Sequence, residues 1–364
     1  MRAHTLLLVA AVAAPIGCAG TQKKNDVPAG MMVRGYTQGG AGNHANIYYF
    51  ETPAGTVVVD VPLRASESKK LRNSMIKPYR IYVTSARAER FGGLDAMRQP
   101  DIKAYTTPAV ATEIQNHGNA RLAPYHAKDD DVPSHVEPPV PAVEERTHDM
   151  VGEVEVELLP LGPAESEASL ALYLPKSGEV ITGDVVTGGE HLDLTWGRSV
   201  VWQDRIAELK ALEPKRVYPG HGDPGGPELL DQTLEYLKFF HDAVAEKVKP
   251  GAPARIKAPE AADVKRKMVA RFPKLGRPEL LDRSIPAEYA VQLAALPPAA
   301  AADPAAAPAP AGGGAAATPA PAAAAPAPTP TPAPAASSSA SGDVDDLLGG
   351  GGGSDSGKKK KKKK

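Results

Sequence analysis

Four polar side chains lie within one short segment, Ile81 to Gly93, and their types limit the chemistry that the segment can perform. Apolar residues at its start predict the end of a strand, and Phe91 to Leu94 predicts the start of a helix. A strand-to-helix turn brings polar side chains together at a sheet edge, where α/β folds place their functional sites. Glutamate can offer oxygens to a metal ion, serine is a poor ligand, and arginine cannot ligate because its guanidinium stays protonated. The four side chains are Ser85, Arg87, Glu89 and Arg90.

The same segment resembles the metal-binding turn of the metallo-β-lactamase superfamily, which has the pattern His-x-His-x-Asp-His before Gly-Gly. On that pattern, Ser85 and Arg87 occupy the positions of two histidines. Glu89 occupies the position of the aspartate, and Arg90 that of the third histidine. Asp60 ends a buried-strand pattern and matches an aspartate that lies behind the turn in the superfamily. The spacing of the turn is therefore kept, whereas its ligand types are changed.

Further segments match the superfamily in the same order along the chain. Gly162 to Leu170 matches the segment that normally supplies another metal histidine, with Glu165 in its place. The Thr-Gly-Asp triplet that ends at Asp184 matches the bridging aspartate, and the Pro-Gly-His triplet that ends at His221 matches the last ligand histidine. The resemblance spans roughly residues 31 to 247. It implies an α/β fold, a four-layer αβ/βα sandwich with its site at one sheet edge.

The resemblance also implies a chemistry, in which two zinc ions lower the pKa of a bridging water that attacks an ester, amide or thioester. Only Asp184 and His221 keep the ligand types of the superfamily. The two arginines and three carboxylates of the matched positions form a set that is nearly neutral without metal. At an effective dielectric constant of 20, a unit positive charge about 5 Å from a guanidinium meets a repulsion of about 3 kcal/mol. The sequence therefore predicts a lost dinuclear site, no catalytic residue and no cofactor.

Three functions are compatible with these residues. The favoured one is a non-catalytic scaffold in which the arginines pair with Glu165, Asp184 and, in part, Glu89. The second is a module that binds an anion through Arg87 and Arg90, because guanidinium forks match carboxylate and phosphate. The third is a hydrolase with a single divalent metal, zinc or another, that acts on an ester, amide or thioester. Its metal ligands would be Glu89, Glu165, Asp184 and His221.

Hydrophobic patterns predict alternating strands and helices that hold these segments in place. The Pro-rich, polar stretch 117–150 is predicted to form loops with solvated histidines. The predicted strands are 46–51, 56–60, 81–84, 101–105, 153–159, 169–174, 179–182 and one that ends at His221. The predicted helices are 65–75, 108–116, 199–212, 227–247, 261–271 and 286–296.

The N-terminus resembles a bacterial lipoprotein signal. Arg2 supplies a positive charge, Leu6 to Ile16 forms an apolar run of 11 residues, and Cys18 is the only cysteine of the chain. The run is too short to span a bilayer as a helix. The resemblance predicts lipidation of Cys18, with a signal over residues 1–18 and a tether over 19–30. The residue after the cysteine is not aspartate, which favours the outer membrane of the cell envelope.

Charge and composition bound the partners of the chain. The formal net charge is −1, and removing the seven lysines Lys358 to Lys364 leaves 35 basic and 43 acidic residues, a charge of −8. A domain of that sign is a poor candidate for binding nucleic acid. Residues 31–296 are predicted as the folded domain, and 297–364 as a disordered Ala/Pro/Gly spacer with a poly-lysine end. The lysines are predicted to bind anionic envelope polymer or lipid, or else to serve as a solubilising end.

Overall fold

The computed structural model describes residues 32–77 and 79–297 of the 364-residue chain. Its first sheet has six strands in the order β1-β2-β3-β4-β5-β6. The first three strands run antiparallel, whereas β3 to β6 run parallel to one another. The strands are β1 (Arg34–Thr37), β2 (Asn46–Thr52), β3 (Gly55–Val59), β4 (Tyr79–Tyr82), β5 (Ala104–Thr106) and β6 (Val140–Pro141).

The second sheet has five strands in the order β11-β10-β9-β8-β7. Strands β7 to β10 form an antiparallel meander, and β11 is added parallel to β10 at the edge. Both sheets therefore contain a parallel pair, β3–β4 and β10–β11, whose carboxyl ends can hold a site. The strands are β7 (Thr147–Val151), β8 (Val154–Gly162), β9 (Ser169–Leu174), β10 (Glu179–Thr187) and β11 (Arg216–His221).

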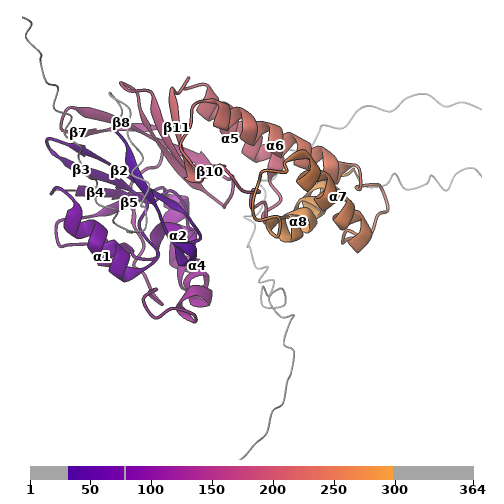
Figure 1. Cartoon of the computed structure of the whole chain (residues 1–364), viewed down its shortest axis with the longest axis horizontal. Coiled ribbons are helices and arrows are strands. Elements are labelled where there is room, and N and C mark those ends of the chain that lie inside the picture. Colours follow the sequence, from indigo (N-terminus) through magenta and orange to yellow (C-terminus); the bar gives the residue numbers. More distant parts are fainter. Residues whose placement is uncertain (1–31, 78, 298–364) are drawn as a thin grey trace, which may run out of the picture. The chain divides into compact units, whose positions relative to one another are not determined.

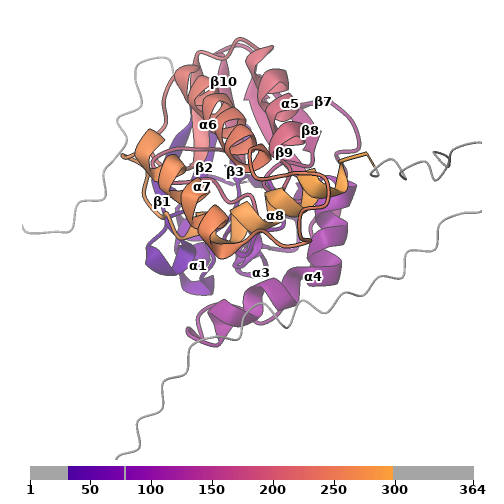
Figure 2. The same cartoon turned by 90° about the vertical axis from the view of Figure 1, so that its right-hand side faces the viewer.

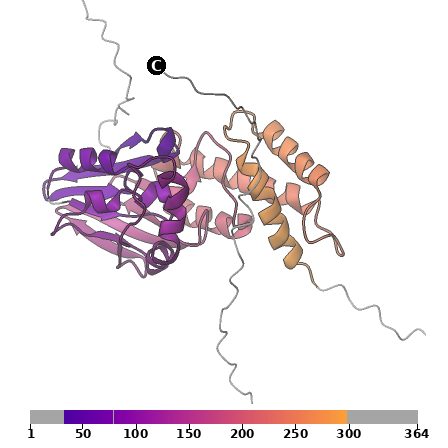
Figure 3. The same cartoon turned by 90° about the horizontal axis from the view of Figure 1, so that it is seen from below.

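Helices cover the outer face of each sheet (Figure 1). Helices α1 to α4 accompany the first sheet, and α5 and α6 accompany the second. In Figure 3, α7 and α8 lie on the side of α5 and α6 that faces away from the first sheet. In Figure 2, α7 and α8 lie in front of the strands. The helices are α1 (Ala65–Ser74), α2 (Ala88–Phe91), α3 (Leu94–Met97), α4 (Pro108–His126), α5 (Ser199–Lys210), α6 (Glu228–Ala245), α7 (Ala258–Arg271) and α8 (Leu280–Ala294).

Three apolar cores separate four layers, because the side chains of a strand alternate between the two faces of its sheet. In β3, Val58 points to the core under α1, α3 and α4, whereas Val57 and Val59 point to the core between the sheets. In β10, Ile181 joins the core between the sheets, and Val180 joins the core under α5 and α6. The chain therefore forms a four-layer αβ/βα sandwich, and the predicted fold class is confirmed.

The prediction of loops over residues 117–150 is wrong in part. This stretch contains the second half of α4 as well as β6 and β7. Helix α4 continues past its predicted end because Leu122 is fully buried in the first core. Gly118 is also buried, and a Cβ there would lie 3.2 Å from Ile114 Cγ2 and at an ordinary contact distance of 3.5 Å from the ring of Phe91.

Helix α8 begins earlier than predicted. It starts at Leu280 and contains Pro286, the residue at which the predicted helix over 286–296 begins. Leu281 and Ile285 anchor the first turns in the core under α5 and α6. The free energy gained by burying these side chains outweighs the cost of the backbone hydrogen bond that a proline inside a helix cannot form.

Several predictions lie outside the described residues. These are the lipoprotein signal with Cys18, the tether over 19–30, and the spacer and poly-lysine end over 297–364, apart from its first residue. Within the described part of the chain, none of the helices combines the length and the apolar character that crossing a membrane requires.

Candidate functional site

The predicted site residues meet at one edge, where the parallel strands of both sheets end. In the first sheet, Asp60 follows β3, and the turn after β4 leads into α2, which carries Glu89 and Arg90. In the second sheet, Asp184 lies in β10 and His221 ends β11. The carboxyl ends of parallel strands are the usual location of sites in α/β folds. The structure thus brings together segments that are more than a hundred residues apart in the chain.

Asp184 is the centre of the contacts at this edge. Its Oδ1 accepts from the Arg90 guanidinium and lies 3.1 Å from Nε2 of His221, and its Oδ2 accepts from Arg90 Nε at 3.0 Å. Arg87 Nε lies 3.5 Å from the same Oδ2. Burial alone would raise the pKa of this carboxyl, but Arg90, His221 and Arg87 together hold its pKa well below the usual range. Asp184 is therefore an aspartate fixed in its ionised form.

Arg90 is enclosed completely, with a side chain that is 0% exposed. Besides Asp184, it donates to the carbonyl oxygen of Asn46 at 2.8 Å and to that of Gly220 at 2.9 Å. Its Nη1 also lies 3.5 Å from Asp60 Oδ2. Because its donors all face protein oxygens, Arg90 has no free direction for an external anion. The predicted anion-binding role is therefore poorly supported at this residue.

Asp60 lies behind the turn, where the sequence predicted it. Its two oxygens accept from Thr84 N at 2.7 Å and Thr84 Oγ1 at 2.8 Å. Burial raises the pKa of Asp60 to about 7, although Arg90 opposes that rise. Gly220 explains the Pro-Gly-His triplet, because a Cβ there would lie 2.2 Å from Asp184 Oδ1 and 2.6 Å from Arg90 Nη2. A glycine is thus required for β11 to approach the ion pair.

Arg87 lies on the solvent side of the same cluster and is partly exposed. Its Nη2 donates to Asp193 Oδ2 at 2.9 Å, and its Nε lies 3.4 Å from Glu89 Oε1. Asp193 also accepts from Arg283 of α8, with 3.1 Å between Nε and Oδ1. Burial would raise the pKa of Asp193, but the two arginines lower it to about 2. Sequence analysis missed Asp193 and Arg283, which no motif marks.

Glu165 and Ser85 are buried beside this cluster. Within the described part of the chain, Glu165 accepts hydrogen bonds from Ser169 Oγ at 3.0 Å and Ser166 Oγ at 3.4 Å rather than from an arginine. Burial and the nearby charge of Asp184 raise the pKa of Glu165 to about 7. Ser85 Oγ is fully buried and has no hydrogen-bond partner among the described residues. The expected pairing of Glu165 with the arginines is therefore replaced by serine contacts.

Three of the four ligands predicted for a single metal form a compact group. Glu89, Asp184 and His221 are all buried, and each offers one ligand atom within 4.8 Å of the others. Nδ1 of His221 has no hydrogen-bond partner in the described residues and lies 3.6 Å from Glu190 Oε1. Two carboxylates and an imidazole suit zinc and other divalent transition metals. The residues present fit one metal ion, and the prediction of no cofactor is corrected by this group.

The charge argument behind that prediction counted too few carboxylates. The structure adds two acidic and two basic side chains to the positions that the motif marked, and it places Asp60 in the same cluster. Six carboxylates and four guanidiniums thus meet here, but burial raises the pKa of Asp60 and of Glu165 to about 7, so these two carboxyls are only partly ionised near neutral pH. The carboxylates are Asp60, Glu89, Glu165, Asp184, Glu190 and Asp193, and the guanidiniums are Arg87, Arg90, Arg277 and Arg283.

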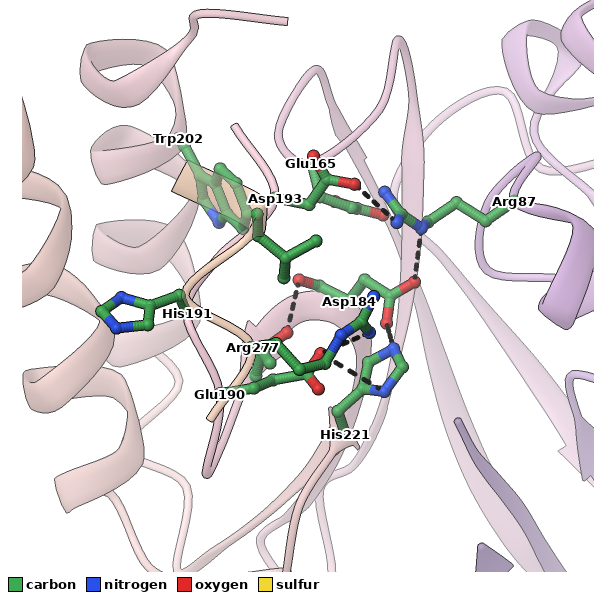
Figure 4. Close-up of a pocket in the computed structure, with 11 residues that line it drawn as sticks. Arg87, Glu165, Asp184, Glu190, His191, Asp193, Trp202, His221 and Arg277 are labelled. Carbon is green, nitrogen blue, oxygen red and sulfur yellow. Dashed lines mark hydrogen bonds and ion pairs between the residues drawn. The ribbon is translucent and has the colours of Figure 1, made fainter. Parts of the chain in front are cut away.

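A small cavity of about 20 Å³ opens beside the candidate ligands (Figure 4). Space of that size holds about one water molecule. Arg277, from the connection between α7 and α8, and Leu280, which begins α8, line it together with Asp184 and His221. Gly276 holds this connection in place, because its N donates to Gly189 O and its O accepts from His191 N, both at 2.9 Å. The C-terminal helices therefore close the site.

The comparisons with known proteins agree with this architecture. The family model described as "Metallo-beta-lactamase superfamily" matches residues 40–221, which is half of the chain. The chain belongs to the metallo-beta-lactamase superfamily. The predicted resemblance is thus confirmed, and membership in a family named for its metal adds to the correction of the cofactor prediction.

Two relatives and one solved structure illustrate the likeness. The chain is 25% identical over 208 residues to a metallo-beta-lactamase type 2 of Bacillus sp. (strain 170), covering 53% of this chain and 73% of that protein. It is 24% identical to the protein of the same name from Bacillus cereus, with the same coverage. A solved metallo-beta-lactamase from Pontibacter korlensis matches with a TM-score of 0.47 and 19% identity, over 57% of this chain and 95% of that one.

Proposed function

We propose that this domain is a superfamily member with a reduced site, which holds one divalent metal ion through Glu89, Asp184 and His221. The observation that carries the proposal is the buried group of three ligand atoms within 4.8 Å of one another. Arg87 and Arg90 beside Asp184 support a single divalent ion rather than two, because each guanidinium repels a further cation. In this proposal the dinuclear site is lost, because other residue types stand where its remaining histidines would be, namely Ser85, Arg87, Arg90 and Glu165.

The proposed activity is hydrolysis of an ester, amide or thioester. A bound divalent ion would supply Lewis acidity and lower the pKa of a water molecule. Arg90 keeps Asp184 ionised and fixed in orientation, and Asp60 contacts Arg90 from behind, which makes both of them positioning residues. Glu165 lines the cavity with a pKa of about 7, so its carboxyl can accept a proton there near neutral pH.

A metal-holding scaffold without turnover is the second candidate. The size of the cavity favours it, because about 20 Å³ admits water but no organic substrate. The two candidates share the metal site and differ in whether a substrate reaches it. Hydrolysis of a small thioester or ester by metal-loaded wild type, absent in His221→Ala, would select the hydrolase.

Divalent metal is expected to stabilise the wild type and not His221→Ala. At a free concentration of 100 times Kd, binding adds about 2.7 kcal/mol, which raises the Tm of a domain of this size by roughly 5–10 °C. Thermal melts of the full chain with zinc, manganese or chelator measure this shift. His135→Ala removes an imidazole whose side chain is 60% exposed and controls for adventitious binding. Equal shifts in wild type and His221→Ala would rule out the proposed site.

We also propose that the protein is an outer-membrane lipoprotein anchored through lipid on Cys18, with Lys358 to Lys364 contacting anionic envelope polymer or lipid. Membrane fractionation of the full chain, Cys18→Ser and a chain ending at Gly357 tests both parts. Wild type is expected to sediment with membranes at any salt concentration. Cys18→Ser is expected to sediment only at low salt, because charge contacts are screened. An unmodified mature N-terminus other than Cys18, found by mass spectrometry, would refute the anchor, and salt-independent binding of Cys18→Ser would refute the lysine contact.

A further inference from the structure

Arg87 divides its contacts between two sets of carboxylates. Its Nε lies 3.4 Å from Glu89 Oε1 and 3.5 Å from Asp184 Oδ2, and both residues belong to the candidate metal ligands. Its Nη2 donates to Asp193 Oδ2 at the shorter distance of 2.9 Å, and Asp193 lies outside the ligand group. Arg87 lines the cavity, whereas the enclosed Arg90 does not (Figure 4). Arg87 is therefore the guanidinium with room to change partners.

A metal ion and the Arg87 guanidinium compete for the same two carboxylates. Both are cations, and each needs the carboxylates of Glu89 and Asp184 to offset the loss of water in a buried place. Asp193 is an alternative partner for the guanidinium, because the two side chains are already hydrogen-bonded. Movement of Arg87 toward Asp193 would leave Glu89 and Asp184 to the metal.

We propose that Arg87 is a built-in competitor of the metal ion and that Asp193 is its alternative partner. This inference rests on the proposed metal site and deepens it by naming what sets its affinity. Without metal, the Arg87 guanidinium neutralises Glu89 and Asp184. With metal, it pairs with Asp193 alone. Arg87 and Asp193 are thus positioning residues that control metal binding without being ligands.

Calorimetric titration of the full chain with zinc chloride tests the exchange. Arg87→Gln removes the competitor and is expected to lower the Kd for zinc by roughly tenfold or more, because a unit charge within several ångströms of a buried divalent ion repels it strongly. Asp193→Asn removes the alternative partner and is expected to raise the Kd by a similar factor. In the double variant the effect of Asp193→Asn should vanish, since Arg87 is no longer there to be moved.

Two matched variants separate charge from other effects. Arg87→Lys keeps the positive charge and is expected to bind zinc within about threefold of wild type, because a point charge replaces the fork. Arg283→Gln, on α8, removes the second guanidinium that pairs with Asp193. It is expected to tighten zinc binding, because Arg87 is then the only arginine paired with Asp193 in the described part of the chain. Thermal melts of each variant in chelator verify that it is folded.

Each outcome of the titration decides between the hypotheses. An Arg87→Gln variant with unchanged or weaker zinc binding overturns the exchange, as does an Asp193→Asn effect of equal size with and without Arg87. If wild type binds no zinc but Arg87→Gln binds one equivalent, the exchange stands and the proposed function of the wild type fails. If neither binds, both fail.

Discussion

Replacing Arg90 with methionine is expected to lower the free energy of unfolding by about 3–5 kcal/mol. The guanidinium is fully enclosed and pairs with Asp184 and Asp60. A methionine fills similar space but removes the cation beside Asp60 and leaves Asp184 with only Arg87 and His221, and the carbonyl groups of Asn46 and Gly220 lose a donor. Urea unfolding in the presence of chelator measures the loss apart from any metal effect.

Arg80→Met is the matched control for that substitution. Arg80 also pairs with an aspartate, Asp149, but its side chain is 44% exposed. An exposed pair contributes about 0–1 kcal/mol, so the expected loss is small. Similar losses in the two variants would show that burial of the Arg90 pair does not determine its contribution.

Replacing Glu165 with glutamine is expected to stabilise the metal-free protein at high pH only. Burial and Asp184 raise the pKa of Glu165 in the folded state from 4.5 to about 7. Between these values the unfolded chain releases this proton while the folded protein keeps it, so stability falls as pH rises and remains lowered above pH 7. Glutamine carries no such proton, so Glu165→Gln should exceed wild type by up to about 3 kcal/mol at pH 8 and match it at pH 4.

Urea unfolding at several pH values, with chelator present, measures this difference. Glu167→Gln is the control, because Glu167 lies two residues away and pairs with Arg198 outside the cluster. A Glu165→Gln variant whose stability changes equally at pH 4 and pH 8 would contradict the pH argument. Such a result would point to packing or hydrogen bonding of the side chain instead.

The layers of the fold could be predicted because local patterns encode them. Val57, Val58 and Val59 form a buried strand, and alternation places them in two different cores. Helix α4 exceeded its prediction because its continuation depends on contact of Leu122 with a core that other elements complete. Periodicity within one segment carries no information on such a contact.

The sequence marked residues that lie together in the structure, but it did not give the charge balance around them. The motif positions marked Glu89, Asp184 and His221, which the structure brings together. The sequence analysis treated Arg87 and Arg90 alike. In the structure, the donors of Arg90 all face protein oxygens, whereas Arg87 lines the cavity. The prediction of no cofactor is wrong because the sequence neighbours of the motif supply only part of the local charge.

The missing charges come from segments that no local pattern connects to the motif. Asp193 lies in the connection between β10 and α5, and Arg277 and Arg283 come from the end of the folded region. Their contribution depends on how α7 and α8 pack, which is a tertiary property. A charge count from sequence is therefore reliable only for residues whose spatial neighbours are already known.

The core under α5 and α6 shows that the segment matched by the family model is shorter than the part of the chain that packs together. The family match ends at residue 221, yet Leu237 and Phe240 of α6 and Leu281 of α8 complete the core that covers the second sheet. A chain shortened to the matched residues would leave Val180 and Val217 of that sheet facing water. It would present an apolar surface of the kind that drives aggregation. Helices α6 and α8 are thus part of what covers the second sheet in this chain.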